Sequence, residues 1–181
     1  IDNDNNGYVD DIYGYNFIDN PDVKGWGTHD GEVVVPVKPQ DHGTHVAGTI
    51  AAVTNNGKGV AGVAGGSGKG DGVRIMTLQI LGGDNTSSDQ NAAVRAMEYA
   101  ADMGAVISQN SWGNNPGVIT SDSNYKVAQS ARYAAFNYFM KKQNHPAVDG
   151  GIIVFAAGNE SAPMAGYPGA YNEYIAVTAL G

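Results

Sequence analysis

A histidine at the start of a helical pattern is the residue of this chain best suited to proton transfer. His42 opens a run of small and apolar residues that extends to Val53, long enough for a helix of about three turns. We expect Asp41 to cap this helix, because its carboxylate can accept the unpaired amide hydrogens of the first turn. The positive end of the helix dipole disfavours an imidazolium there, so a neutral His42 is available as a general base near pH 7.

Two further polar segments each follow an apolar strand pattern. The first ends in Asn110-Ser111-Trp112-Gly113 and the second in Ala156-Ala157-Gly158-Asn159. Asn159 carries a carboxamide that can donate hydrogen bonds to a developing negative charge. In parallel sheets, binding sites lie beyond the carboxyl ends of the strands, which is where both segments fall.

The hydrophobic patterns between these segments predict the elements that position them. We expect strands at 73–81, 105–109, 151–156 and 174–179, and helices at 89–103 and 126–142. The alternation of strand and helix indicates βαβ units, and hence an α/β fold with a mostly parallel sheet and right-handed crossovers. The expected core positions of the two helices are Ala93, Ala96, Met97 and Ala100, then Val127, Ala131, Ala134, Ala135, Tyr138 and Phe139.

The first forty residues contain few helical patterns. Tyr13, Tyr15 and Phe17 alternate as expected for a short extended segment with one aromatic face. Residues 19–40 are rich in Gly, Pro and Asn and predict a surface loop, with a brief strand at 33–35.

Residues 1–11 resemble the first half of a calcium-binding loop. Oxygen-bearing side chains alternate at Asp2, Asp4 and Asn6, and Gly7 then permits a sharp turn. Tyr8 would offer its carbonyl and Asp10 its carboxylate, directly or through water. Since Tyr13 stands where an EF-hand has its closing Glu, the loop is no complete EF-hand. The alternative is a solvated acidic turn, but carboxylates this close repel one another without a cation.

Together and in this order, the His42 block, the Asn110-Ser111-Trp112-Gly113 block and the Ala156-to-Asn159 block resemble the signature blocks of the subtilisin-like serine proteases. The resemblance runs from about Gly7 to the C-terminus. It implies a secreted or cell-surface serine endopeptidase, stabilised by calcium, whose three-layer fold has helices on both faces of the sheet.

The resemblance also implies a role for each matched residue. His42 would be the general base, and Asn159 would donate its side-chain amide to the oxyanion. Residues Ser111, Trp112 and Gly113 would pair with the substrate backbone as an added strand. Residues Ala156, Ala157 and Gly158 would line the pocket for the residue before the scissile bond. Many subtilases have an aliphatic residue in place of Trp112, so the resemblance does not define the shape of the pocket. The alternative for residues 111–113 is a strand-to-loop turn with Trp112 packed on the core.

Two parts of the family's machinery have no counterpart in these residues. The triad Asp normally ends an apolar strand before the acidic loop, where this chain begins, and the triad Ser normally sits in a Gly-Thr-Ser-Met-Ala block that is absent. We therefore expect residues 1–181 to form a single partial catalytic domain with no peptidase activity alone. Neighbours of the missing strand would expose unpaired backbone groups, which predicts rearrangement or self-association.

The amino-acid composition argues against several classes of binding partner. The net charge is −8 with ten basic residues in 181, which argues against nucleic acid, because that partner requires clustered Lys and Arg. No apolar run reaches the ~18 residues needed to span a bilayer. The absence of cysteine excludes disulfides and a thiol nucleophile. We expect a protein or peptide substrate, and neither nucleic acid nor membrane as a partner.

One competing function uses the same fold. A non-catalytic calcium-binding or peptide-binding domain derived from a subtilase would keep these blocks without a complete triad. An unrelated hydrolase or metal enzyme finds no support, because no nucleophile elbow or metal-ligand set is present.

Overall fold

The computed structural model describes residues 5–6, 8, 11, 14–18, 41–81, 91–142 and 148–179. The chain divides into two compact units, residues 1–92 and 93–181. The brief strand predicted at 33–35 lies outside the described residues.

The histidine-bearing helix of the first unit is α1 (His42–Ala51), two residues shorter than predicted. The Gly-rich segment that follows folds back on its end, where the amides of Gly62, Val63 and Ala64 donate to the carbonyls of Ala52, Thr49 and Ile50. These bonds satisfy carbonyls that a helix end leaves without partners.

The prediction that the Asp41 carboxylate caps α1 is wrong. Asp41 occupies the N-cap position, but its φ of −80° and ψ of −10° are helical, and its side chain makes no capping hydrogen bond. A capping side chain needs an extended backbone to reach the first-turn amides. The carbonyl of Asp41 instead accepts from the His45 amide at 2.8 Å.

A short parallel pair of strands completes the described part of the first unit. Strand β1 (Gly14–Asn16) pairs with β2 (Thr77–Gln79), with Tyr15 opposite Leu78. Phe17 is buried, and its ring lies 5.0 Å from that of Tyr15 and 5.9 Å from that of Tyr8, which confirms the predicted aromatic packing for Tyr15 and Phe17. Tyr13 lies outside the described residues.

The strand predicted at 73–81 is shorter and less buried than its apolar sequence indicates. Only Thr77–Gln79 pair as a strand, while Val73 and Ile75 are exposed. Within the described part of its unit β2 has a single partner strand, so the sequence before Thr77 lacks the neighbours that would extend the ladder.

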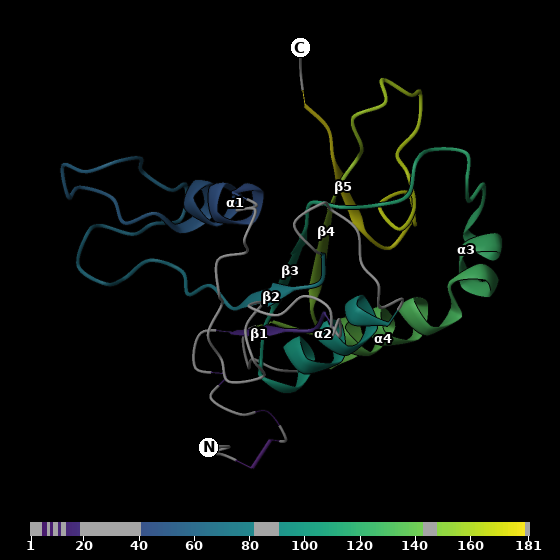
Figure 1. The fold of residues 1–181 in the computed structure, drawn as a ribbon, viewed down its shortest axis with the longest axis horizontal. Helices are drawn as coiled ribbons and strands as arrows, with labels where there is room; N and C mark the ends of the chain where they lie inside the picture. The colour runs from purple at the N-terminus through teal and green to yellow at the C-terminus, as the bar shows by residue number, and fades with distance from the viewer. Residues whose placement is uncertain are drawn as a thin grey trace. The chain divides into compact units, whose positions relative to one another are not determined.

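The second unit is built on a three-stranded parallel sheet (Figure 1). The strands are β3 (Ile107–Asn110), β4 (Ile152–Ala156) and β5 (Ile175–Val177), in the order β3-β4-β5. Asn110 lies opposite Phe155, and Ala156 lies opposite Val177. All strand pairs in the described part of the chain are parallel, which confirms the predicted α/β class.

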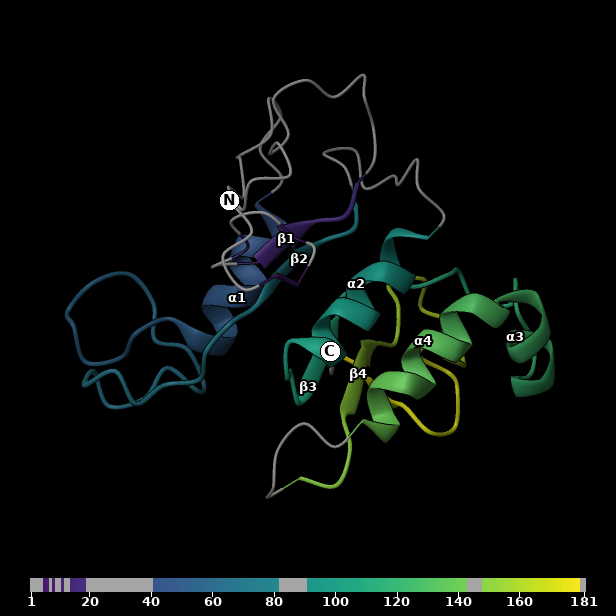
Figure 2. The same ribbon diagram turned by 90° about the horizontal axis from the view of Figure 1, so that it is seen from below.

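Helices α2 (Ala92–Asp102) and α4 (Ser130–Lys141) lie side by side over β3 and β4 (Figure 2). The predicted core residues of α2 are all buried. Beneath α4, the ring of Phe136 stacks on that of Phe155, with centroids 5.8 Å apart. This contact joins the helix to the centre of the sheet.

The single helix predicted at 126–142 is wrong, because two helices occupy this region. They are α3 (Asp122–Ala128) and α4, separated at Gln129, whose φ of −125° and ψ of 44° interrupt the helix. The break changes the helical phase, so Val127 is 79% exposed while Phe136, absent from the predicted face, is buried. Ala131, Ala134 and Tyr138 are exposed as well, whereas Ala135 and Phe139 are buried as predicted.

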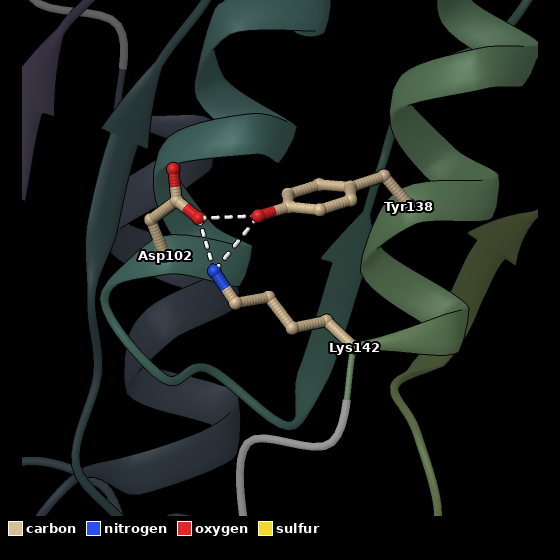
Figure 3. Close-up of polar contacts among 3 residues, drawn as sticks. All are labelled: Asp102, Tyr138 and Lys142. Atoms are coloured by element: carbon tan, nitrogen blue, oxygen red, sulfur yellow. Dashed lines mark hydrogen bonds and ion pairs between the residues drawn. The ribbon is translucent and has the colours of Figure 1, made fainter.

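A polar cluster joins the ends of α2 and α4 (Figure 3). One carboxylate oxygen of Asp102 accepts from the Tyr138 hydroxyl at 2.7 Å and from the Lys142 ammonium, which also donates to Tyr138 at 2.8 Å. The hydrogen bond from Lys142 lowers the pKa of Asp102, and the same bond raises the pKa of Lys142. We refer to Asp102, Tyr138 and Lys142 as the helix-end cluster.

Candidate functional site

Both predicted substrate-binding segments of the second unit leave the same edge of the sheet. Residues 111–113 follow β3 and residues 157–159 follow β4. Since Asn110 and Phe155 are register partners, the two segments begin on adjacent strands at the carboxyl edge. The second unit therefore brings Ser111, Trp112 and Gly113 next to the start of Ala156, Ala157 and Gly158.

Asn110 and Trp112 are fixed at the end of β3 by hydrogen bonds and ring contacts. The indole N–H of Trp112 donates to the side-chain oxygen of Asn110 at 3.2 Å. The Asn110 amide donates to the Val154 carbonyl on β4 at 3.3 Å. The Trp112 ring meets the ring of Phe155 edge-on at 5.3 Å. The side chain of Trp112 is thus half-buried against the core, rather than free in solvent.

Ser111 is half-buried like Trp112, whereas Gly113 is exposed. The Ser111 hydroxyl accepts from the side-chain amide of Gln109 at 2.7 Å. Gly113 is exposed, and beyond it the Asn114 amide donates to the Tyr167 carbonyl at 2.8 Å. This bond ties the chain after Gly113 to a second loop of the same unit.

The segment after β4 is held from both sides by backbone hydrogen bonds. The Ala157 amide donates to the Val177 carbonyl at 2.9 Å, and the Ala157 carbonyl accepts from the Gly166 amide at 3.2 Å. Ala156 and Gly158 are exposed, and Gly158 adopts a φ of +115° that favours glycine.

Asn159 is exposed at the end of this segment. Its backbone amide donates to a carboxylate oxygen of Glu160 at 2.8 Å. Because its carboxamide is exposed, that group is accessible to an incoming ligand.

Sequence reasoning missed the loop that borders both segments. Gly166 and Tyr167 supply the backbone groups that bind Ala157 and Asn114. The dense turn signal of Gly166-Tyr167-Pro168-Gly169, a few residues after Asn159, could have indicated it.

A buried tyrosine cluster supports this loop. Tyr125 of α3 has ring contacts with Tyr167, Tyr171 and Tyr174, at 5.5, 5.5 and 6.3 Å. The Tyr167 hydroxyl donates to Asp122 at 2.7 Å, and burial raises the pKa of Tyr167 to about 12. Helix α3 and the loop at Gly166 therefore form one packed region.

His42 belongs to the first unit, where it is exposed at the start of α1. Its position at the helix N-terminus agrees with the prediction. Asn159 belongs to the second unit, so the convergence of these two side chains on one cleft stays a prediction.

The predicted calcium loop is described in part. Asp2, Asp4 and Asp10 lie outside the described residues. The side-chain oxygen of Asn6 accepts from the Tyr8 amide at 2.7 Å, while its amide donates to Asp11 at 2.8 Å. The described residues hold no cluster of three or more His, Asp or Glu side chains that could bind a metal.

The parallel strand pairs, with helices packed on the sheet of the second unit, define an α/β protein. The comparison with known families is specific: a model of the subtilase family matches residues 4–181. The chain belongs to the subtilase family, and its parallel sheets and helices form a partial version of the three-layer α/β fold.

The relatives point to the same family. The chain is 35% identical to thermitase of Thermoactinomyces vulgaris over 86% of this chain and 46% of thermitase. It is 33% identical to a thermophilic serine proteinase of Bacillus sp. strain AK1, over 93% of this chain and 33% of the relative. It is also 33% identical to the major intracellular serine protease of Bacillus subtilis strain 168, over 75% and 36% of the two chains. The chain thus spans between a third and a half of the length of these relatives.

Among the described residues, no helix has both the length and the apolar character needed to cross a bilayer.

Proposed function

We propose that the whole protein is a serine endopeptidase that hydrolyses peptide bonds by a Ser-His-Asp mechanism. His42 takes the proton of the serine hydroxyl and returns it to the leaving amine, and Asn159 donates its carboxamide to the oxyanion. The serine and the aspartate come from parts of the protein outside residues 1–181, which make up part of one catalytic domain.

The observation that carries this proposal is the match of residues 4–181 to the subtilase family. Further support comes from the position of His42 at a helix N-terminus, and from the position of Asn159 three residues after the end of β4. A peptide is the substrate that suits these parts, because residues 111–113, which follow β3, would pair with a peptide backbone as an added strand.

The test is peptide hydrolysis by the protein encoded by the whole gene. We expect an organophosphorus fluoride, which labels activated serines, to abolish activity, and His42→Ala to lower kcat by several orders of magnitude. For Asn159→Ala we expect about a 10²–10³-fold loss in kcat with KM nearly unchanged; subtilisin is the known case for this value. His45→Ala, one turn along the same helix, is the matched control and should retain activity.

A different outcome would support the competing function. If the whole protein binds peptides or calcium but neither hydrolyses peptides nor reacts with the fluoride, it is a non-catalytic domain on a subtilase fold.

The N-terminal loop is proposed to bind a structural calcium ion through Asp2, Asp4, Asn6, Tyr8 and Asp10. The donor set fits a hard cation, because it consists of carboxylate, carboxamide and carbonyl oxygens. Asn6 contributes a side-chain carboxamide oxygen to this set, and the Tyr8 amide donates to that oxygen at 2.7 Å.

A secreted or cell-surface location follows from the same loop. A calcium loop without the closing Glu of an EF-hand is expected to bind weakly, and weak sites fill only at the roughly millimolar calcium found outside cells. Since one relative is named as intracellular, family membership alone does not set the location. Immunodetection of the native protein in medium and cell fractions tests this proposal.

A further inference from the structure

Asn110 and Trp112 flank Ser111 at the end of β3, and their side chains are bonded to each other. The Trp112 indole donates to the Asn110 side-chain oxygen. The amide of the same Asn110 side chain donates to the Ser108 hydroxyl at 2.8 Å and to the Val154 carbonyl at 3.3 Å. Asn110 is 7% exposed, so one buried carboxamide joins its own strand, the neighbouring strand and the tryptophan.

The indole ring is held on the helix side of the sheet. It lies edge-on to Phe155 and to Phe136 of α4, with the Phe136 centroid 6.2 Å away, and the guanidinium of Arg132 lies 5.4 Å from its ring centre. Phe155 and Phe136 are fully buried and stacked on each other. A ring with these neighbours anchors the backbone of residue 112 to the core.

We propose that Asn110 and Trp112 are positioning residues that hold the segment 111–113 extended, so that its backbone is ready to pair with a peptide. The buried Asn110 side chain acts through the backbone of this segment and not by contact with the substrate. The inference rests on the proposed peptidase function and deepens it. It adds an internal, positioning role to the predicted place of Trp112 in the substrate-binding segment.

The physical reason is the entropy of ordering a segment. When the backbone of one residue becomes ordered only on binding, the association constant falls by roughly a factor of 10. A segment that is already fixed avoids this loss. The benefit reaches only substrates long enough to pair with residues 111–113.

Substrate length therefore gives the test. The whole protein is assayed with a peptide that extends four residues before the scissile bond and with a single acyl-amino-acid ester. For Asn110→Leu and for Trp112→Phe, which keeps a ring but removes the N–H donor, we expect kcat/KM on the long peptide to fall about 10–100-fold, mainly through KM. The ester should change less than about 3-fold, and the double variant should lose no more than the worse single variant.

Asp102→Asn is the matched control for general destabilisation. Asp102 lies at the end of α2, at the opposite end of β3 from Asn110 and the segment 111–113. A loss of stability caused by Asp102→Asn should therefore leave the ratio of peptide to ester activity unchanged. If Asn110→Leu leaves the ratio of peptide to ester activity unchanged, because both activities fall equally or neither falls, the proposal is overturned.

Hydrogen exchange on the same proteins separates this inference from the proposed function. We expect the Asn114 amide, which donates to the Tyr167 carbonyl directly after this segment, to be protected in the parent protein and to exchange at least about 10-fold faster in Asn110→Leu, with α2 unaffected. If the parent protein hydrolyses neither substrate, the peptidase proposal fails, and exchange of this amide alone decides the role of Asn110. An Asn114 amide that exchanges at the same rate in the parent protein and in Asn110→Leu would overturn the positioning role.

Discussion

Tyr125 and Tyr174 place their hydroxyl oxygens 3.4 Å apart inside the second unit, which joins α3 to the residue before β5. Both side chains are buried. Burial raises the pKa of Tyr125 to about 12 and raises that of Tyr174 above its ordinary value as well. The neutral phenols are therefore favoured in the folded protein.

This pair predicts a loss of stability in alkali. Below pH 10 both the folded and unfolded chains keep the phenol protons; above it the unfolded chain releases them first, so the free energy of unfolding falls as pH rises toward 12. For Tyr125 the contribution lost is on the order of 2–3 kcal/mol. Tyr125→Phe should reduce this alkaline slope in urea unfolding measured at pH 8 to 12. Phe136→Leu destabilises without a titrating group and should keep the slope; an unchanged slope in Tyr125→Phe contradicts the prediction.

The helix-end cluster predicts a small, salt-sensitive contribution to stability. Asp102 and Lys142 are partly exposed, so solvent screening limits the pair to about 0.5 kcal/mol. Asp102 has a lowered pKa, so its contribution to the free energy of unfolding is present above about pH 4 and is lost as pH falls further. Lys142 has a raised pKa, so its contribution to the free energy of unfolding is lost only above about pH 10.5.

Asp102→Asn should therefore lower Tm slightly at pH 7 and remove the salt dependence. Lys141→Gln also removes one charge, of the opposite sign, one residue from the cluster and serves as the control. Equal Tm shifts in the two variants would exclude a specific role for the cluster.

The surroundings of Gly166 predict that adding a single methyl group at this position destabilises the fold. A Cβ at this position would overlap the Asn114 carbonyl, whereas a Cβ on Gly113 would lie 3.5 Å from the Tyr167 carbonyl, an ordinary contact. Gly166→Ala should cost about 1–3 kcal/mol of unfolding free energy, because backbone must shift, and Gly113→Ala should cost less. Chemical denaturation compares the two; similar losses would mean that the loop at Gly166 adapts freely.

Calcium removal tests the N-terminal loop. A ligand present at about 10 times its Kd stabilises the folded state by about 1.4 kcal/mol, so chelation should lower the Tm of the whole protein by a few degrees. Asp4→Asn should weaken the response to added calcium, and Asp71→Asn, in the glycine-rich segment after α1, should leave it intact. A Tm that is equal with calcium and with chelator removes the case for this site.

The 181-residue chain alone is predicted to associate and to lack peptidase activity. Four side chains on one face of the β3-β4-β5 sheet are 42–60% exposed: Ile107, Ile152, Ile175 and Val177. Exposed apolar area of this kind favours contact between copies.

Sedimentation should therefore show a concentration-dependent oligomer that Ile107→Lys weakens and Val118→Lys, outside the sheet, does not. A compact monomer would contradict the association. Peptide hydrolysis abolished by His42→Ala would contradict the predicted inactivity.

Local patterns were sufficient to predict the order of the strands β2 to β5 and the presence of helices α1 and α2, but not the division between α3 and α4. The periodicity of α2 placed Ala93, Ala96, Met97 and Ala100 in the core, where they are buried. The start of α3 had a local signal that was missed, because Ser121 caps it by accepting from the Asn124 amide at 3.1 Å. The break at Gln129 had no such signal, and it moved the buried face of α4 to Phe136.

The sequence by itself determined which chemical groups this protein carries and their order along the chain, because helices and strands depend on residues close in sequence. It identified His42, Asn159 and the family blocks around them. Only the tertiary structure decided that Trp112 faces the core. Its partner Asn110 bonds to Val154, 44 positions away, and contacts between such distant residues depend on how strands and helices pack rather than on any local pattern.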